Sequence, residues 1–190
     1  MQRTVFNTPV IRHFFVFISW IAFKITRWKI EGSPPEDPKY VLIGAPHTSN
    51  WDFPLTLGTA FLTHLDFYWL GKHTLFKGPF GPVMRYLGGL AIDRSKSGNM
   101  VQSTINAFNH CDRLTVAIAP EGSRTSVKEW KKGFYHIAYG ASVPISRAFL
   151  DYDRKVAGFG PAFFPTGDIE KDIKEIRDFY KGIKGRHANG

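Results

Sequence analysis

Two short blocks of the sequence carry residue types that could do chemistry. In the first block His47 stands five positions before Asp52, so a carboxylate could hold one imidazole nitrogen while the other nitrogen acts as a general base. In the second, Pro120-Glu121-Gly122-Ser123-Arg124, a carboxylate and a guanidinium flank a glycine turn and could anchor a hydroxylated, phosphorylated ligand. A His-x4-Asp pair is common by chance, whereas the second string is rare.

Both blocks follow apolar runs rich in β-branched residues, at 40–43 and 114–118. Such runs are typical of buried strands. Open α/β sheets bind their ligands at the carboxyl ends of strands. We therefore expect each block to lie where a buried strand ends.

At these residues the chain resembles the glycerolipid acyltransferase family, which includes 1-acylglycerol-3-phosphate and other lysophospholipid acyltransferases. Its members carry His-x4-Asp, a Gly-x-x-x-x-Arg-type block, Phe-Pro-Glu-Gly-Thr-Arg and an apolar Val-Pro-Ile, in that order. The matching blocks here are 46–52, 89–94, 119–124 and 143–145, within roughly residues 38 to 150. Pro46 replaces the Asn that usually precedes the histidine, and Ser123 replaces the commoner Thr of the second block. Neither change removes a catalytic group.

The chemistry of acyl transfer assigns catalytic roles to the first block. A thioester is already activated, so the reaction needs a base for the acceptor hydroxyl and a site for the oxyanion, without a covalent nucleophile. His47 is the candidate base, and Asp52 would fix its tautomer; the alternative is a histidine that caps the next helix. Lys72, where the family often has a lysine, could stabilise the oxyanion with the backbone N–H of Gly122, or be a solvated lysine.

The resemblance also implies a binding site for the acceptor. Arg124 would meet its phosphate and Glu121 would orient its glycerol hydroxyl, with Ser123 between them in the same substrate-binding block. Arg94 would add a second phosphate contact. The alternatives are a structural ion pair at a tight turn for Glu121 and Arg124, and a surface position for Arg94.

Composition limits the class of partner. The 190 residues suffice for one domain with a sizeable core, and one cysteine excludes an internal disulfide framework. A net charge of +9 indicates an anionic partner: nucleic acid, phospholipid headgroups or a phosphorylated substrate. The basic residues are scattered and no nucleic-acid-binding motif is present, so nucleic acid is not expected. The aromatic content of 15% favours a membrane interface.

The N-terminal segment mixes aromatic and basic residues between Val10 and Ile30. Its apolar run, 14–23, is about ten residues, too short for a hydrocarbon core of about 30 Å. We therefore predict a membrane-interface helix within residues 1–32, on the cytoplasmic face of the cell membrane; the alternative is a helix packed on the protein's own core. A Gly- and Pro-rich breaker at 32–38 would separate it from an acyltransferase domain at 38–190.

Periodicity predicts the elements of that domain. We expect strands near 40–45, 67–71, 89–93, 114–119 and 143–149. We expect helices near 52–64, 79–87, 97–110, 133–141 and 168–183, the last with Asp168 as its N-cap. Residues 151–167 are predicted to form a turn and loop. This alternation predicts an α/β fold, and the resemblance implies a mixed sheet flanked by helices, glycerol-3-phosphate acyltransferase-like.

These observations together predict a membrane-associated enzyme of phospholipid biosynthesis. It would transfer a fatty acyl chain from acyl-CoA or acyl carrier protein to a lysophospholipid, most simply 1-acylglycerol-3-phosphate. We expect the thioester as co-substrate, with no metal and no other cofactor, because no metal-ligand spacing is present. The alternatives are another lysolipid acceptor, such as an amino-acid-headed lipid, and a non-catalytic membrane-lipid-binding module.

Overall fold

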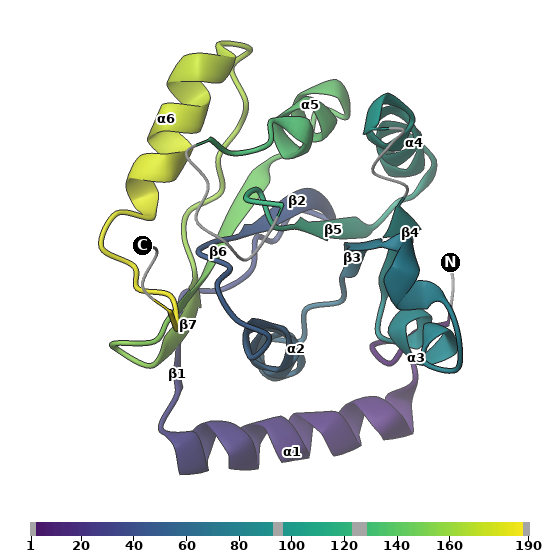
Figure 1. Cartoon of the computed structure of the whole chain (residues 1–190), viewed down its shortest axis with the longest axis vertical. Coiled ribbons are helices and arrows are strands. Elements are labelled where there is room, and N and C mark those ends of the chain that lie inside the picture. Colours follow the sequence, from purple (N-terminus) through teal and green to yellow (C-terminus); the bar gives the residue numbers. More distant parts are fainter. Residues whose placement is uncertain (1–2, 93–96, 123–128, 188–190) are drawn as a thin grey trace.

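A single mixed sheet organises the chain. The computed structural model describes residues 3–92, 97–122 and 129–187, and within these residues seven strands are hydrogen-bonded in the order β1-β7-β6-β2-β5-β3-β4 (Figure 1). The strands are β1 (Lys29–Glu31), β2 (Lys39–Gly44), β3 (Tyr68–Lys72), β4 (Gly89–Ile92), β5 (Leu114–Ile118), β6 (Ile145–Asp151) and β7 (Val156–Phe159). Neighbours are parallel except β6 and β7, which are antiparallel.

Helices cover both faces of this sheet, which confirms the predicted α/β fold class (Figure 1). On one face lie α4 (Ser97–His110), α5 (Gly133–Gly140) and α6 (Ile169–Phe179). On the other face lies α2 (Asp52–Leu62), with α1 (Pro9–Thr26) outside it. The short α3 (Gly81–Tyr86) and the 3-10 turn η1 (His73–Phe76) connect β3 to β4.

The two central strands bring the predicted chemical blocks to one edge of the sheet. β2 reads Tyr-Val-Leu-Ile without a polar break and is buried on both faces, as expected for a parallel strand between helical layers. It pairs in parallel with β5, with Val41 opposite Val116 and Ile43 opposite Ile118. Because the register is level, the residues that follow the two strands leave the sheet side by side. His47 and Glu121 thus emerge at the same edge.

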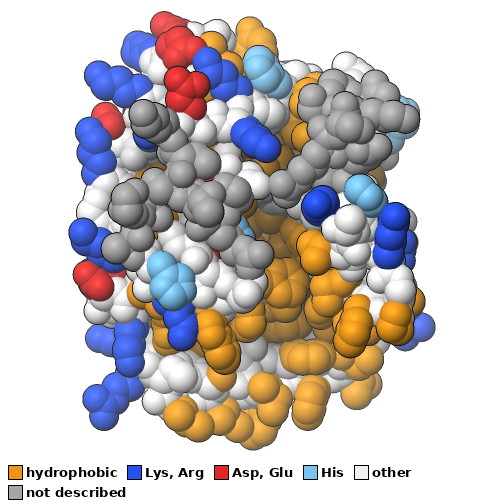
Figure 2. Space-filling model, in the orientation of Figure 1, with side chains coloured by type: hydrophobic (Ala, Val, Ile, Leu, Met, Phe, Trp, Pro, Cys, Tyr) orange, Lys and Arg blue, Asp and Glu red, His pale blue; other side chains and the backbone are white. Residues whose placement is uncertain are grey.

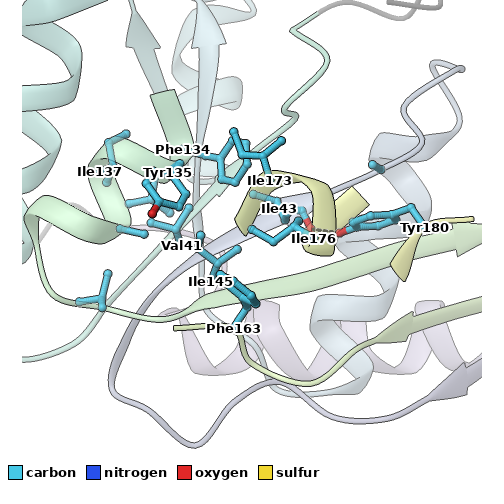
Figure 3. Close-up of a cluster of buried hydrophobic side chains, with 14 of the residues drawn as sticks. Val41, Ile43, Phe134, Tyr135, Ile137, Ile145, Phe163, Ile173, Ile176 and Tyr180 are labelled. Atoms are coloured by element: carbon cyan, nitrogen blue, oxygen red, sulfur yellow. Dashed lines mark hydrogen bonds between the residues drawn. The ribbon is translucent and has the colours of Figure 1, made fainter. Parts of the chain in front are cut away.

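The larger core fills the space between the sheet and α5 and α6. Figure 3 shows side chains of β2, β6, α5 and α6 meeting there, among them Ile43, Phe134, Ile145 and Ile176. The predicted N-cap is confirmed, because the Asp168 carboxylate accepts a hydrogen bond from the N–H of Lys171, 3.2 Å away. These contacts pack α5 and α6 on the strands whose carboxyl ends carry His47 and Glu121.

A second core lies under α2 and includes residues that precede α1. Val5 and Phe6 are buried, and the Phe6 ring lies 5.3 Å from Phe61 of α2 and 5.2 Å from Phe67 (centroid distances). Arg12 of α1 forms an ion pair with Asp66 at 3.2 Å. The N-terminal segment is therefore packed and ion-paired onto the body of the protein.

Two short strands were missed by the sequence prediction. The segment 151–167, predicted as turn and loop, contains β7, and β1 lies just before the breaker at 32–38. β1 has three residues and forms the edge of the sheet, and its Lys-Ile-Glu sequence has no apolar run. β7 is buried at all four positions, but Val-Ala-Gly-Phe is too short to show a period. The five strands and five helices predicted between residues 40 and 183 are all present, within a few residues of their expected bounds.

Candidate active site

His47 and Asp52 form a hydrogen-bonded pair where β2 ends and α2 begins. The Nδ1 atom of His47 lies 2.9 Å from Oδ2 of Asp52. The same oxygen accepts the backbone N–H groups of Thr48 (2.8 Å) and Ser49 (2.9 Å), so the turn that leads into α2 wraps around the carboxylate. With Nδ1 engaged, Nε2 is the imidazole nitrogen left to exchange a proton with a ligand.

The carboxylate of Asp52 is kept ionised although it is buried. Burial by itself would raise the pKa of Asp52, but hydrogen bonds from the His47 ring, the Ser49 N–H and the Tyr152 hydroxyl outweigh it, and the pKa lies below its ordinary value. An ionised acid beside the imidazole stabilises the imidazolium that forms when the ring takes a proton. The pair therefore has the electrostatics of a general base with its orienting acid.

Glu121 joins the second block to the first. Its Oε2 accepts the backbone N–H of His47 at 3.0 Å, across the gap between the ends of β5 and β2. Burial raises the pKa of the Glu121 carboxyl, and the hydrogen bond from His47 opposes part of that rise. Glu121 thus fixes the backbone of His47, the candidate base, through a contact that the sequence prediction did not include.

A cavity of about 820 Å³ opens beside these residues. His47, Lys72, Gly122 and Lys131 line it near the strand ends, and apolar side chains under α2 line the rest. The apolar wall includes Leu42, Ala60, Leu65, Phe67, Trp69, Leu150 and Phe159. Figure 2 shows one face of the molecule, with hydrophobic side chains in the hollow at its middle and along its lower edge. The site therefore combines a polar, basic mouth with a mainly apolar interior.

Comparison with known proteins identifies the family. A family model described as Acyltransferase matches residues 27–146, more than half of the chain. The chain belongs to the acyltransferase family. This match confirms the resemblance inferred from the motifs, and it covers the strands that carry both blocks.

A solved structure resembles this acyltransferase across nearly its whole length. The crystal structure of the 1-acyl-sn-glycerophosphate (LPA) acyltransferase PlsC from Thermotoga maritima is similar to it, with a TM-score of 0.61 and 17% sequence identity. The similarity covers 94% of this chain and 81% of that one. At this identity the similarity establishes the fold. No curated protein sequence matches the acyltransferase.

Both residues predicted to stabilise the oxyanion, Lys72 and Gly122, line the cavity near its mouth. Lys72 is the last residue of β3 and is exposed there. Gly122 has φ of +66°, and its N–H, expected to face the oxyanion, instead donates to the carbonyl of Ala119 at 3.0 Å, within the same turn. A Cβ atom on Gly122 would lie 2.8 Å from the side chain of Lys131, so glycine lets this lysine cross the turn. Lys131 therefore joins Lys72 as a cation at the cavity mouth, whereas Lys132 is ion-paired to Glu170.

Three predicted substrate-binding residues, Arg94, Ser123 and Arg124, lie outside the described residues, so their roles remain predictions from the motif.

Within the described part of the chain, no group of three or more His, Cys, Asp and Glu side chains could hold a metal ion.

The structure adds one residue that sequence reasoning did not find. The hydroxyl of Tyr152, in the turn between β6 and β7, donates to Oδ1 of Asp52 at 2.7 Å. The two residues are 100 positions apart, and no motif contains Tyr152, so no local spacing could have indicated the contact.

Proposed function

We propose that this acyltransferase moves a fatty acyl chain from acyl-CoA or acyl carrier protein to the hydroxyl of a lysophospholipid, most simply 1-acylglycerol-3-phosphate. The observation that carries this proposal is the 2.9 Å pair of His47 and Asp52 at the mouth of an apolar cavity of about 820 Å³. A base and an aliphatic binding space in one site are what transfer of a fatty acyl chain to an alcohol requires.

In the proposed reaction the acceptor hydroxyl gives its proton to Nε2 of His47 while its oxygen attacks the thioester carbonyl. The C–O bond forms, and the carbonyl oxygen takes up negative charge near the cationic groups of Lys72 and Lys131. The C–S bond then breaks, and the imidazolium returns the proton to the departing thiolate. Asp52 stays ionised throughout and stabilises the imidazolium, which supports its assignment as the orienting acid.

The apolar interior supports a fatty acyl chain as the transferred group. The cavity wall extends from Lys72, at the carboxyl end of β3, to Phe67, just before that strand. Five residues of strand rise about 16 Å, enough to house much of an extended aliphatic chain. A small acyl group such as acetyl would leave most of this apolar surface uncovered, so a long chain fits the cavity better.

The acceptor is proposed to be phosphorylated because the motif supplies cations beside the base. Arg124 and Arg94 are the residues of the two family blocks that would meet a phosphate. Lys131 at the cavity mouth and the net charge of +9 favour the same class of ligand. The structurally similar protein is described as a 1-acyl-sn-glycerophosphate acyltransferase, which supports this acceptor as the first to be tested.

We propose a membrane surface, on the cytoplasmic face, as the place of reaction. Helix α1 is longer than the ten-residue apolar run seen in the sequence: it has 18 residues and, by length and composition alone, could cross a membrane. One of its faces packs on the protein, with Phe15 stacked on Phe61 and Phe23 buried. Its outer face exposes Val10, Phe14, Phe17, Ile18, Trp20 and Ile25. A helix held along the protein by one face, with an apolar outer face, supports a peripheral or monotopic position in the interface.

The deciding experiment incubates purified protein with labelled acyl-CoA or acyl carrier protein and a panel of lysolipids, including 1-acylglycerol-3-phosphate and amino-acid-headed lipids. We expect transfer to 1-acylglycerol-3-phosphate, and loss of about 10²–10⁴-fold in His47→Ala. His136→Ala is the control, because His136 is exposed on α5 and does not line the cavity. Failure to acylate any lysolipid, or a His47→Ala variant as active as the control, would contradict the proposal.

A further inference from the structure

Tyr152 reaches the side of the Asp52 carboxylate that the catalytic turn leaves uncovered. The backbone of Thr48 and Ser49 and the ring of His47 all bind Oδ2. The Tyr152 hydroxyl binds the other oxygen, Oδ1, from the turn between β6 and β7. Asp52 is buried, with 4% of its surface exposed, so Oδ1 depends on a protein donor rather than on bulk water. The carboxylate is thus clamped from two directions by two separate segments of the chain.

The ring that carries this hydroxyl is itself held in place. Trp28, just after α1, meets the Tyr152 ring edge to face, with centroids 5.1 Å apart and planes at 89°. The backbone N–H of Tyr152 donates to the carbonyl of Lys184 at 2.9 Å. Trp28 in turn packs on Phe23, whose ring leaves no room for a side chain at Gly58 of α2. The orientation of the hydroxyl therefore depends on the seating of the end of α1.

Electrostatics make Tyr152 a donor at neutral pH. Burial and the hydrogen bond to Asp52 both raise the pKa of Tyr152 well above its ordinary value, so the phenol keeps its proton. An ionised carboxylate cannot donate, and hence the direction of this hydrogen bond is fixed. Hydrogen bonds to charged groups are among the stronger ones in proteins.

We propose that Tyr152 is a positioning residue for the pair of His47 and Asp52, and that Trp28 holds its ring in the orientation this role requires. The proposal rests on the proposed function, in which His47 is the base. By holding Oδ1, the hydroxyl fixes the plane of the carboxylate and keeps Oδ2 directed at the imidazole. It also draws charge from the carboxylate, and so sets how strongly Asp52 binds the imidazolium.

The experiment compares Tyr152→Phe with Tyr135→Phe. Both substitutions remove a tyrosine hydroxyl that donates to a buried aspartate, because the Tyr135 hydroxyl binds Oδ2 of Asp172 at 2.8 Å, away from the cavity. We expect Tyr152→Phe to lower kcat about tenfold to a hundredfold, with the KM of donor and acceptor little changed, because misorientation of the carboxylate and imidazole outweighs the stronger attraction between them. Tyr135→Phe should lower the melting temperature and leave kcat unchanged.

The pH profile separates positioning from a merely structural role. A carboxylate that has lost one donor binds the imidazolium more strongly, so the acidic limb of kcat/KM should move to higher pH in Tyr152→Phe and stay in place in Tyr135→Phe. The other titratable groups that act on this network, within the described residues, are Glu121 and, through Tyr152, Arg186. An acidic limb that coincides with wild type, or moves to lower pH, would overturn the proposal.

Trp28→Leu tests the second half of the proposal. Alone, Trp28→Leu should cause part of the kcat loss seen in Tyr152→Phe, because the Tyr152 hydroxyl is present but its ring is no longer held by the indole. In the Tyr152→Phe background it should add no further loss to kcat, since its effect passes through the missing hydroxyl. Fully additive losses would contradict a role for Trp28 through Tyr152.

A measurement without substrate keeps this test distinct from that of the proposed function. Diethyl pyrocarbonate modifies unprotonated imidazole, and peptide mass spectrometry can compare His47 with the exposed His136 in the same sample. Tyr152→Phe should slow modification of His47 relative to His136, and Tyr135→Phe should not. If wild type acylates no lysolipid but this ratio shifts, the proposed function fails and the positioning role stands. If wild type is active and the ratio does not shift, the positioning role fails.

Discussion

Asp52→Asn isolates the charge of the orienting acid from its hydrogen bonds. The amide carbonyl can take the place of Oδ2 and accept from Thr48, Ser49 and the His47 ring. The amide NH₂ then faces the Tyr152 hydroxyl, which can rotate and become the acceptor. The local structure and the imidazole tautomer are therefore expected to survive, and the variant lacks only the negative charge.

The expected loss follows from the distance between the two charges. Unit charges about 4 Å apart attract by about 4 kcal/mol at an effective dielectric constant of about 20. The dipole of the new carbonyl retains part of this attraction, so we expect the transition state to lose about 3 kcal/mol. That corresponds to a decrease of about 10²-fold in kcat, with donor and acceptor KM unchanged.

The assay is steady-state transfer of labelled acyl chains at equal folded fraction, established by circular dichroism and thermal melting. Asp172→Asn is the matched control, since Asp172 is also buried and accepts from a tyrosine hydroxyl, but lies on α6 away from the cavity. It should lose stability and keep kcat. An Asp52→Asn variant within about fivefold of wild type would refute the electrostatic role, and a loss near 10⁴-fold would indicate that the tautomer had changed.

Three further predictions address the acceptor, the membrane and acid stability. Arg124→Lys should raise the KM of the lysophospholipid and leave the donor KM unchanged, because an ammonium cannot replace a bidentate guanidinium–phosphate contact; a change in donor KM alone would contradict the assignment. The double variant Phe17→Glu/Trp20→Glu should lose binding to anionic vesicles in co-sedimentation. Tyr139→Glu, at an exposed aromatic on α5, is the control and should bind like wild type. Equal binding by wild type, the double variant and the control would exclude the outer face of α1 as the membrane contact. Hydrogen bonds from Thr166 and Tyr135 outweigh burial and lower the pKa of Asp172 in the folded protein. Its contribution to stability is therefore present above pH 3.8 and is lost as the pH falls through the lower pKa of the folded state. Asp172→Asn should make the free energy of unfolding, measured with denaturant, less dependent on pH in this acidic range, and an unchanged pH dependence would contradict this account.

The sequence predicted the elements whose own residues carry a strong pattern. The run Tyr-Val-Leu-Ile of β2 and the capped, periodic α6 could be read locally, and so could the placement of His47 and Glu121 after buried strands. The contacts that complete the site could not. Glu121 binds a backbone N–H 74 positions away and Tyr152 binds a carboxylate 100 positions away, and side-chain spacing within one segment carries no information about either.

The role of the first residues was also beyond local pattern. Val5 and Phe6 stand in a mixed polar segment, and their burial depends on Phe61 and Phe67, which are far along the chain. Deleting the N-terminal segment to test membrane binding would therefore remove core side chains and the edge strand β1 as well. Charge substitutions on the exposed face of α1 are the sharper test, because they leave the buried contacts in place.

The parallel pairing of β1 with β7 has a consequence for how the chain folds during synthesis. Lys29 pairs with Val156, so most of the chain must be made before β1 finds its neighbour. At about 5–20 residues per second, this interval is roughly 6 to 25 s. Phe23 and Phe15 can meet Gly58 and Phe61 of α2 early in this interval, but Trp28 lacks Tyr152 and Phe23 lacks its contacts around β7 until the interval ends. If the proposed membrane site is correct, the exposed outer face of α1 is available to a bilayer throughout this interval, before β1 joins the sheet.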